Sequence, residues 1–141
     1  DSGEFGRWYQ AYRVGDAFGT SMYLYIHYDT IGYFRYPIGA SFFRIKRNLV
    51  ELAYGKKPAL LIELSGEPWL TQPIIDTPIE FQLERMGLDK LQEMVEHGRD
   101  AGFEEQYLWG AEWWYWMKLR GHTEHWEYAK GLFNMSETQS Q

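Results

Sequence analysis

Glu63 is the residue of this chain whose position best suits it for chemistry. A short apolar run, Ala59-Leu60-Leu61-Ile62, ends in this carboxylate, and a turn at Ser65-Gly66 follows at once. Apolar runs of this length, bounded by Pro and Gly, are typical of buried parallel strands. A charge at the carboxyl end of such a strand is costly to bury, and α/β sheets and barrels place their chemistry at this end. Glu63 is therefore a candidate catalytic carboxylate, with a salt-bridged strand end as the alternative.

Aromatic residues are unusually frequent. Seven Trp, eleven Tyr and eight Phe make up 18% of the chain. Aromatic rings stack on flat apolar faces such as those of sugar rings, although most rings in any protein fill its core. Trp109, Trp113, Trp114 and Trp116 are too closely spaced to share one side of a strand or helix. Some of them are therefore expected to face a cleft, a partner or solvent, and Trp69, Trp109 and Trp113 are candidate binding residues.

Three further polar side chains are candidates to act beside Glu63. Tyr23, near the end of an earlier expected strand, could donate its phenolic hydrogen to Glu63, or it could be a core residue. Glu67, four residues past Glu63 on a turn, could be a second carboxylate, a solvated loop residue or the partner of an Arg or Lys. Glu112, between Gly110 and Trp113, could hydrogen-bond to sugar hydroxyls or form a salt bridge.

Composition excludes several other functions. At 141 residues the chain supports one domain, and its net charge of −6 argues against binding to nucleic acid phosphates. There is no Cys for a disulfide or a thiolate nucleophile, and no apolar stretch approaches the roughly 20 residues of a membrane span. Localisation stays open. The charge suits a neutral or cationic partner, and the aromatic residues favour a poly- or oligosaccharide.

No metal or cofactor is predicted. His122 and His125 are three residues apart without a clear third ligand, and a surface helix cap explains them better. The segment 15–19 lacks the Lys of a phosphate-binding loop and the strand-turn-helix context of a dinucleotide site. Ser65-Gly66 lacks the Gly-x that precedes the Ser of a nucleophile elbow.

The elements expected to position these residues alternate between strands and helices. Strands are predicted at about 20–28, 58–64 and 104–109, and helices at 8–13, 41–54, 88–101 and 124–133. Thr77 is predicted to cap a further helix, and Phe42, Ile45, Leu49 and Leu52 form the apolar stripe of the 41–54 helix. Segment 29–40 reads as a loop, 113–119 as strand extension or loop, and 134–141 as a disordered tail.

Alternation of this kind favours an α/β domain over 1–133, built on a parallel sheet with right-handed crossovers. Three strands would leave both outer edges of the sheet open. We therefore expect either a partner that supplies the missing strands or a homo-oligomer.

Four motifs support a family resemblance. DSGEFGRW (1–8), GDAFGTSMY (15–23), LLIELSGEPW (60–69) and YLWGAEWWYWMK (107–118), in this order and spacing, resemble the C-terminal half of the (β/α)8-barrel glycoside hydrolases of clan A. The likeness is greatest to cellulase-like barrels from uncultured bacteria. It implies a partial (half) TIM barrel in which residues 1–4 follow the fifth strand, 20–25 form the sixth and 107–109 the eighth.

The resemblance implies a role for Glu63. It would be the nucleophile at the end of the seventh strand in a retaining hydrolase of β-linked polysaccharides. No Asn-Glu pair, the fourth-strand motif that carries the general acid/base in that family, occurs in the chain. A complementary N-terminal half-barrel would have to supply that acid. Two alternatives are open, a non-catalytic carbohydrate-binding module and a self-assembling half-barrel.

Overall fold

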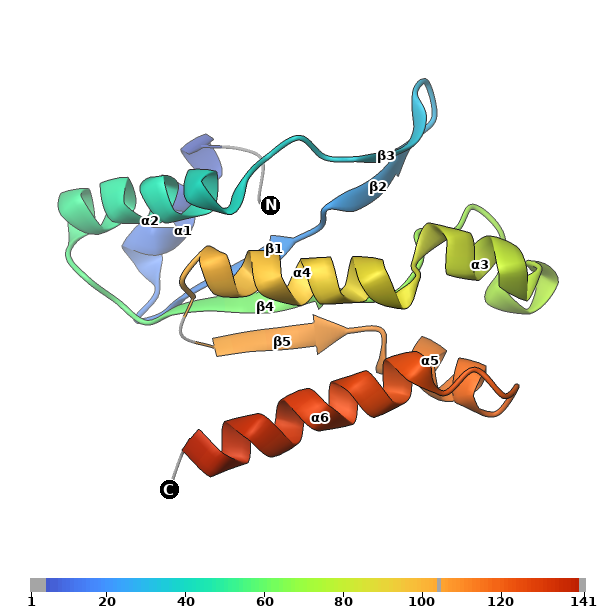
Figure 1. Ribbon diagram of the computed structural model, residues 1–141. Coiled ribbons are helices and arrows are strands. Elements are labelled where there is room, and N and C mark those ends of the chain that lie inside the picture. Colours follow the sequence, from blue (N-terminus) through green and yellow to red (C-terminus); the bar gives the residue numbers. More distant parts are fainter. Residues whose placement is uncertain (1–4, 104, 140–141) are drawn as a thin grey trace.

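The computed structural model describes residues 5–103 and 105–139 of the chain. Strands and helices alternate along much of it, as the sequence predicts (Figure 1). The strands are β1 (Phe18–Met22), β2 (Tyr25–Tyr28), β3 (Gly32–Arg35), β4 (Ala59–Ser65) and β5 (Glu105–Trp109). The helices are α1 (Phe5–Val14), α2 (Ala40–Tyr54), the 3-10 turn η1 (Ile74–Asp76), α3 (Ile79–Arg85), α4 (Leu88–Asp100), α5 (Ala111–Lys118) and α6 (Glu124–Gln139).

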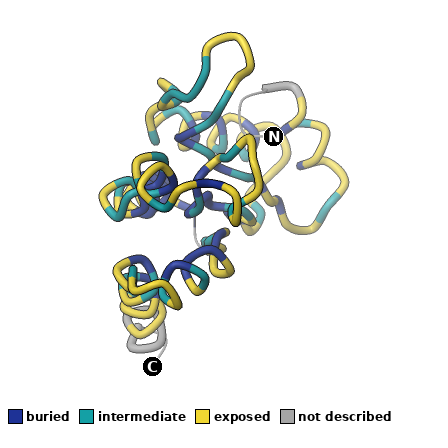
Figure 2. Tube along the Cα trace, turned by 90° about the vertical axis from the view of Figure 1, so that its right-hand side faces the viewer, coloured by how far each residue is buried: buried dark blue, intermediate teal, exposed yellow. Residues whose placement is uncertain are grey.

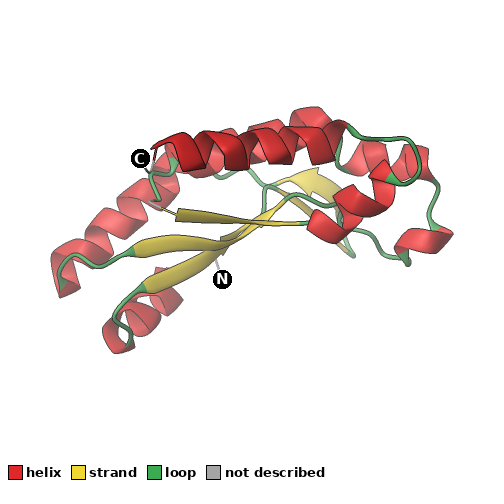
Figure 3. Ribbon diagram, turned by 90° about the horizontal axis from the view of Figure 1, so that it is seen from below, coloured by secondary structure: helices red, strands yellow, loops and turns green. Residues whose placement is uncertain are grey.

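A three-stranded parallel sheet of order β1-β4-β5 forms the centre of the fold. Helix α2 connects β1 to β4, and α4 connects β4 to β5, so that each crossover is a βαβ unit. The α/β class with parallel strands is therefore confirmed. The long helices α4 and α6 run along the same side of the sheet (Figure 3), and Leu91, Met94 and Val95 of α4 are buried.

The opposite face of the sheet is open. Gly19, Ile62, Tyr107 and Trp109 occupy it, and all four are exposed. A Cβ on Gly19 would lie 2.8 Å from the Ile62 side chain, so only glycine leaves room for that side chain. Within the described residues, β1 and β5 each have one neighbouring strand, which leaves an outer edge of the sheet unpaired on each side.

A β-bulge in β4 determines where Glu63 lies. Leu61 pairs with Thr20 of β1, but the next pair joins Glu63 to Ser21, so that Ile62 is one residue extra. The pairing with β5 shifts over the same stretch. Because of this extra residue, Leu61 and Leu64 are both fully buried, although they are three positions apart in the strand and strict alternation would place them on opposite faces. Bulges re-aim side chains in this way and occur often beside active sites.

The sequence predicts the length of α2 but not its buried side. Phe43, Lys46 and Val50 face the core, whereas Ile45, Leu49 and Leu52 of the predicted stripe are exposed. The orientation follows from packing on α1, where the Lys46 ammonium lies 4.2 Å from the centre of the Trp8 ring. A cation over an indole face is stabilised even when it is removed from water.

The prediction of a single strand over residues 20–28 is wrong. The chain leaves the sheet at Tyr23, and β2 then pairs antiparallel with β3 in a hairpin. Segment 29–40, predicted as a loop, therefore contains a strand. Leu24 is buried, and its carbonyl accepts the backbone N–H of Tyr36 at 2.6 Å. This pairing redirects the chain out of the parallel sheet.

Three predictions for the second half of the chain also need correction. The strand-or-loop segment 113–119 lies largely in helix α5, because Trp113, Trp114 and Met117 are buried at helical spacing. Helix α6 continues to Gln139, well into the predicted disordered tail. Thr77 does not cap α3: its hydroxyl donates to the carbonyl of Pro73 at 2.9 Å, and Pro78 takes the cap position.

Candidate functional site

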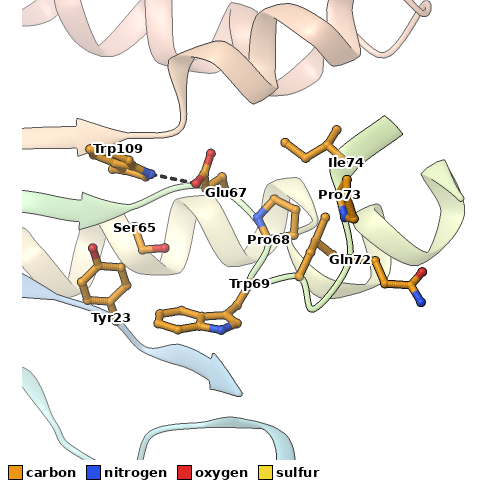
Figure 4. A pocket seen from close by; sticks show the side chains of 10 residues that line it. Tyr23, Ser65, Glu67, Pro68, Trp69, Gln72, Pro73, Ile74 and Trp109 are labelled. Atoms are coloured by element: carbon orange, nitrogen blue, oxygen red, sulfur yellow. Dashed lines mark hydrogen bonds between the residues drawn. The ribbon is translucent and has the colours of Figure 1, made fainter. Parts of the chain in front are cut away.

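A cavity of about 520 Å³ opens at the carboxyl ends of the parallel strands (Figure 4). This volume suits a small organic ligand. Its wall comes from the residue after β1, the ends of β4 and β5, and the loop that follows β4. The lining residues are Tyr23, Ser65, Glu67, Pro68, Trp69, Leu70, Gln72, Pro73, Ile74 and Trp109. Four of the predicted site residues, Tyr23, Glu67, Trp69 and Trp109, are among them.

Glu63 reaches the cavity through Tyr23. The Tyr23 hydroxyl donates to Glu63 Oε2 at 2.6 Å, the contact that the sequence suggests. Burial raises the pKa of the Tyr23 phenol, and the carboxylates of Glu63 and Glu67 raise it further. The phenol therefore remains a hydrogen-bond donor at neutral pH. Glu63 itself is half-buried and is not among the residues that line the cavity.

Glu67 has a partner of a different kind from the predicted Arg or Lys. Its Oε1 accepts the indole N–H of Trp109 at 2.7 Å (Figure 4). This hydrogen bond joins the loop after β4 to the end of β5 and holds both side chains at the cavity wall. The second carboxylate oxygen of Glu67 takes no part in the bond to Trp109 and can accept a hydrogen bond from a ligand hydroxyl.

The turn after β4 is held tightly in place. Gly66 donates its backbone N–H to the carbonyl of Trp109 at 2.7 Å, and its own carbonyl accepts the indole N–H of Trp114 at 2.7 Å. A Cβ on Gly66 would lie 2.6 Å from the Trp114 ring. Gly110, at φ 125°, has the backbone conformation that lets α5 begin directly after β5. These contacts fix the loop that carries Glu67.

Trp69 forms a second aromatic wall. Its ring meets the Tyr23 ring edge-on, with 5.9 Å between the ring centres. It is 47% exposed, so a large part of the indole is free to contact a ligand. Figure 4 shows Trp69 and Trp109 at separate positions around the cavity.

Besides Glu63, two further predicted site residues do not line the cavity. Trp113 is fully buried, and its indole N–H donates to Gln82 Oε1 at 2.7 Å, so it is a core residue. Glu112 is exposed in the first turn of α5 and does not line the cavity. Trp113 is excluded because the helical turn of α5 directs it into the core.

The prediction that both His are surface residues is wrong for His125. It is buried, lies edge-on to Trp113 and has its Nε2 3.0 Å from the carbonyl of Met86. Burial lowers its pKa. The described residues contain no cluster of three or more His, Cys, Asp or Glu that could hold a metal ion.

Sequence reasoning missed several cavity residues at the end of β4 and in the segment that follows it. Ser65, Gln72 and Ile74 line the cavity without any motif that marks them. The usable signal was indirect, since a long loop at the carboxyl end of a parallel strand commonly forms a binding site. Residues 1–4, which the family resemblance places after a preceding strand, lie outside the described residues.

Tyr23→Phe tests the hydrogen bond through its dependence on pH. At pH 7 we expect the variant to be less stable than the parent by roughly 1.5 kcal/mol, the scale of a hydrogen bond to a charged group. The folded phenol has a raised pKa, so the unfolded chain loses this proton first as pH rises above about 10. The advantage of the parent must therefore shrink above that pH. Denaturant unfolding of both proteins between about pH 7 and pH 11 measures it, and a constant difference would contradict the assignment.

Comparison of the chain with protein-family models, curated proteins and solved structures finds no match. Within the described part of the chain, no helix combines the length and the apolar character needed to cross a membrane. The function is therefore argued from the geometry of the site.

Proposed function

We propose that this chain is part of a retaining glycoside hydrolase that acts on β-linked polysaccharides, with Glu63 as nucleophile. The observation that carries the proposal is the 2.6 Å hydrogen bond from Tyr23 to Glu63 beside an aromatic cavity at the carboxyl ends of parallel strands. A carboxylate held by one donor keeps its second oxygen for attack. Trp69 and Trp109 offer the apolar ring faces on which a sugar stacks.

The chemistry assigns a role to each group. An oxygen of the Glu63 carboxylate attacks the anomeric carbon while the glycosidic bond breaks, and the electron pair leaves with the aglycone oxygen. Water then cleaves the glycosyl ester. Tyr23 orients Glu63. Glu67 accepts a hydrogen bond from a hydroxyl of the bound sugar, and the bond from Trp109 holds the Glu67 carboxylate in place. The leaving oxygen still needs a proton from an acid about 5–5.5 Å from the nucleophile.

We infer that this acid comes from a complementary half-barrel. Three features support a half TIM barrel: parallel strands, helices along one side, and Ile62, Tyr107 and Trp109 exposed on the other. A second set of parallel strands would cover these side chains and pair with the open edges. A second copy of this chain would bring another Glu63 to the site rather than the proton donor that the reaction needs.

Titration with disaccharides tests the binding part of the proposal. We expect cellobiose, or its xylose or mannose counterpart, to change the Trp fluorescence of the chain in a saturable manner. Trp69→Ala should weaken this binding roughly tenfold, as expected for loss of an aromatic wall. Tyr115→Ala is the matched control, because Tyr115 is as exposed as Trp69 (48% against 47%) but does not line the cavity. Absence of binding to all three sugars would refute the proposal.

A non-catalytic carbohydrate-binding module is the second candidate. The observation that favours it is the hydrogen bond between Glu67 and Trp109, which gives the second carboxylate near Tyr23 a structural partner. Saturable binding without any reaction at Glu63 would support this alternative.

A further inference from the structure

The β2–β3 hairpin has one face fixed to the helices. The Tyr25 hydroxyl donates to Glu93 of α4, and Arg35 Nε donates to Glu93 Oε1 at 2.7 Å. The Tyr33 hydroxyl donates to the backbone carbonyl of Arg85 at the end of α3. A two-stranded hairpin is only marginally stable alone. These contacts therefore hold it rigid, and its position relative to the cavity is fixed.

The other face of the hairpin carries a row of rings. Strand alternation places Tyr28, Phe34 and Tyr36 on the side opposite Tyr25 and Tyr33. The Tyr28 and Phe34 rings are 6.0 Å apart between centres, and Phe34 and Tyr36 are 6.4 Å apart. We call these three residues the hairpin ladder. Figures 1 and 2 show the hairpin extending from the body of the fold, and Tyr28 near its tip is 56% exposed.

The hairpin ladder begins next to the cavity. Tyr36 donates its backbone N–H to Leu24, which directly follows the cavity residue Tyr23. Figure 4 shows the chain continuing from Tyr23 into β2 along the side of the cavity that Trp69 occupies. The backbone at Tyr36 thus lies next to the residue that follows Tyr23, and the rings continue from Tyr36 through Phe34 to Tyr28 near the tip of the hairpin.

We propose that the hairpin ladder binds the part of a β-linked glycan chain that extends beyond the cavity, so that the site prefers polysaccharides to short oligosaccharides. This inference rests on the proposed function. Rings offer apolar faces to the C–H faces of sugars, and the phenols of Tyr28 and Tyr36 can hydrogen-bond to sugar hydroxyls. The fixed opposite face reduces the loss of conformational entropy when the glycan binds.

Chain length of the ligand separates the ladder from the cavity. We expect the parent to bind cellohexaose more tightly than cellobiose, as measured by Trp fluorescence or calorimetry. Tyr28→Ala should weaken cellohexaose binding roughly threefold to tenfold and leave cellobiose binding unchanged. Ile31→Ala is the matched control, since Ile31 is 71% exposed in the same hairpin but is not part of the ladder. It should bind both sugars as the parent does.

The outcomes distinguish the two proposals. Equal affinity for the two sugars, or equal losses in Tyr28→Ala and Ile31→Ala, overturns the ladder and leaves the proposed function standing. Failure of the parent to bind either sugar overturns the ladder, and if the xylose and mannose disaccharides also fail to bind, the proposed function falls with it. A Tyr28→Ala variant with unchanged cellohexaose binding but altered self-association would identify the ladder as a protein interface and also overturn the inference. Far-ultraviolet circular dichroism confirms that each variant is folded.

Discussion

Glu63→Gln is expected to abolish formation of a covalent glycosyl adduct on this chain. Dinitrophenolate leaves without a proton, so a dinitrophenyl β-cellobioside tests the nucleophile even where no acid is present. The parent should release a burst of dinitrophenolate and gain the mass of one cellobiosyl group on the peptide that contains Glu63. The neutral amide is a poor nucleophile, so the release rate should fall on the order of 10³-fold or more.

The matched variants make this result specific. The side-chain amide oxygen in Glu63→Gln can still accept the Tyr23 hydrogen bond, so the variant should keep its fold. Glu112→Gln changes an exposed carboxylate that does not line the cavity and should react as the parent does. An adduct on another residue, or equal reaction of parent and Glu63→Gln, would remove Glu63 from the mechanism.

Trp113→Ala is expected to destabilise the protein by about 3–5 kcal/mol, the range for removal of a buried Trp. The side chain is fully buried, and its loss also leaves Gln82 Oε1 without its donor. Gln82 is itself buried, and its amide nitrogen donates to the carbonyls of Ile74 and Thr77. This one Trp therefore supports the polar residue that holds the loop between β4 and α3. Denaturant unfolding measures the difference in free energy.

Trp109→Ala provides the contrast. Trp109 is half-exposed at the cavity, so its removal should reduce stability much less, by about 1 kcal/mol for the lost hydrogen bond to Glu67. Once both variants are shown to be folded, Trp109→Ala should weaken sugar binding more than Trp113→Ala does. A Trp113→Ala variant as stable as the parent would mean that the indole does not support the core.

The sequence predicts β4 and its carboxylate well because the signal is local. An apolar run between Pro58 and Gly66 indicates a buried strand, and the residue that ends it is Glu63. The contact with Tyr23 was also predictable, since neighbouring parallel strands bring their carboxyl ends together. The bulge at Ile62 was not predictable, because the uninterrupted apolar run 59–62 carries no information on which face of the sheet each side chain takes.

The errors have a common physical cause, the override of local preference by packing. Segment 20–28 is rich in aromatic and β-branched residues, which fit one long strand as well as two short ones. The Trp-rich α5 also has side chains typical of strands, yet Gly110 turns the chain and three of its side chains fill the core. Lys46 is not part of the predicted apolar stripe of its helix, yet it is buried against Trp8.

The central place of β4 has a consequence for how firmly Glu63, the proposed nucleophile, is held in position. Backbone hydrogen bonds at sheet margins open more often than those of a strand with neighbours on both sides. Glu63 sits on the only strand of the described parallel sheet that has two such neighbours. Fraying of β1 would loosen Tyr23, and fraying of β5 would loosen Trp109, before the carboxylate of Glu63 moved. If the proposed function holds, local opening would thus change the affinity for sugar before it displaced the carboxylate of Glu63.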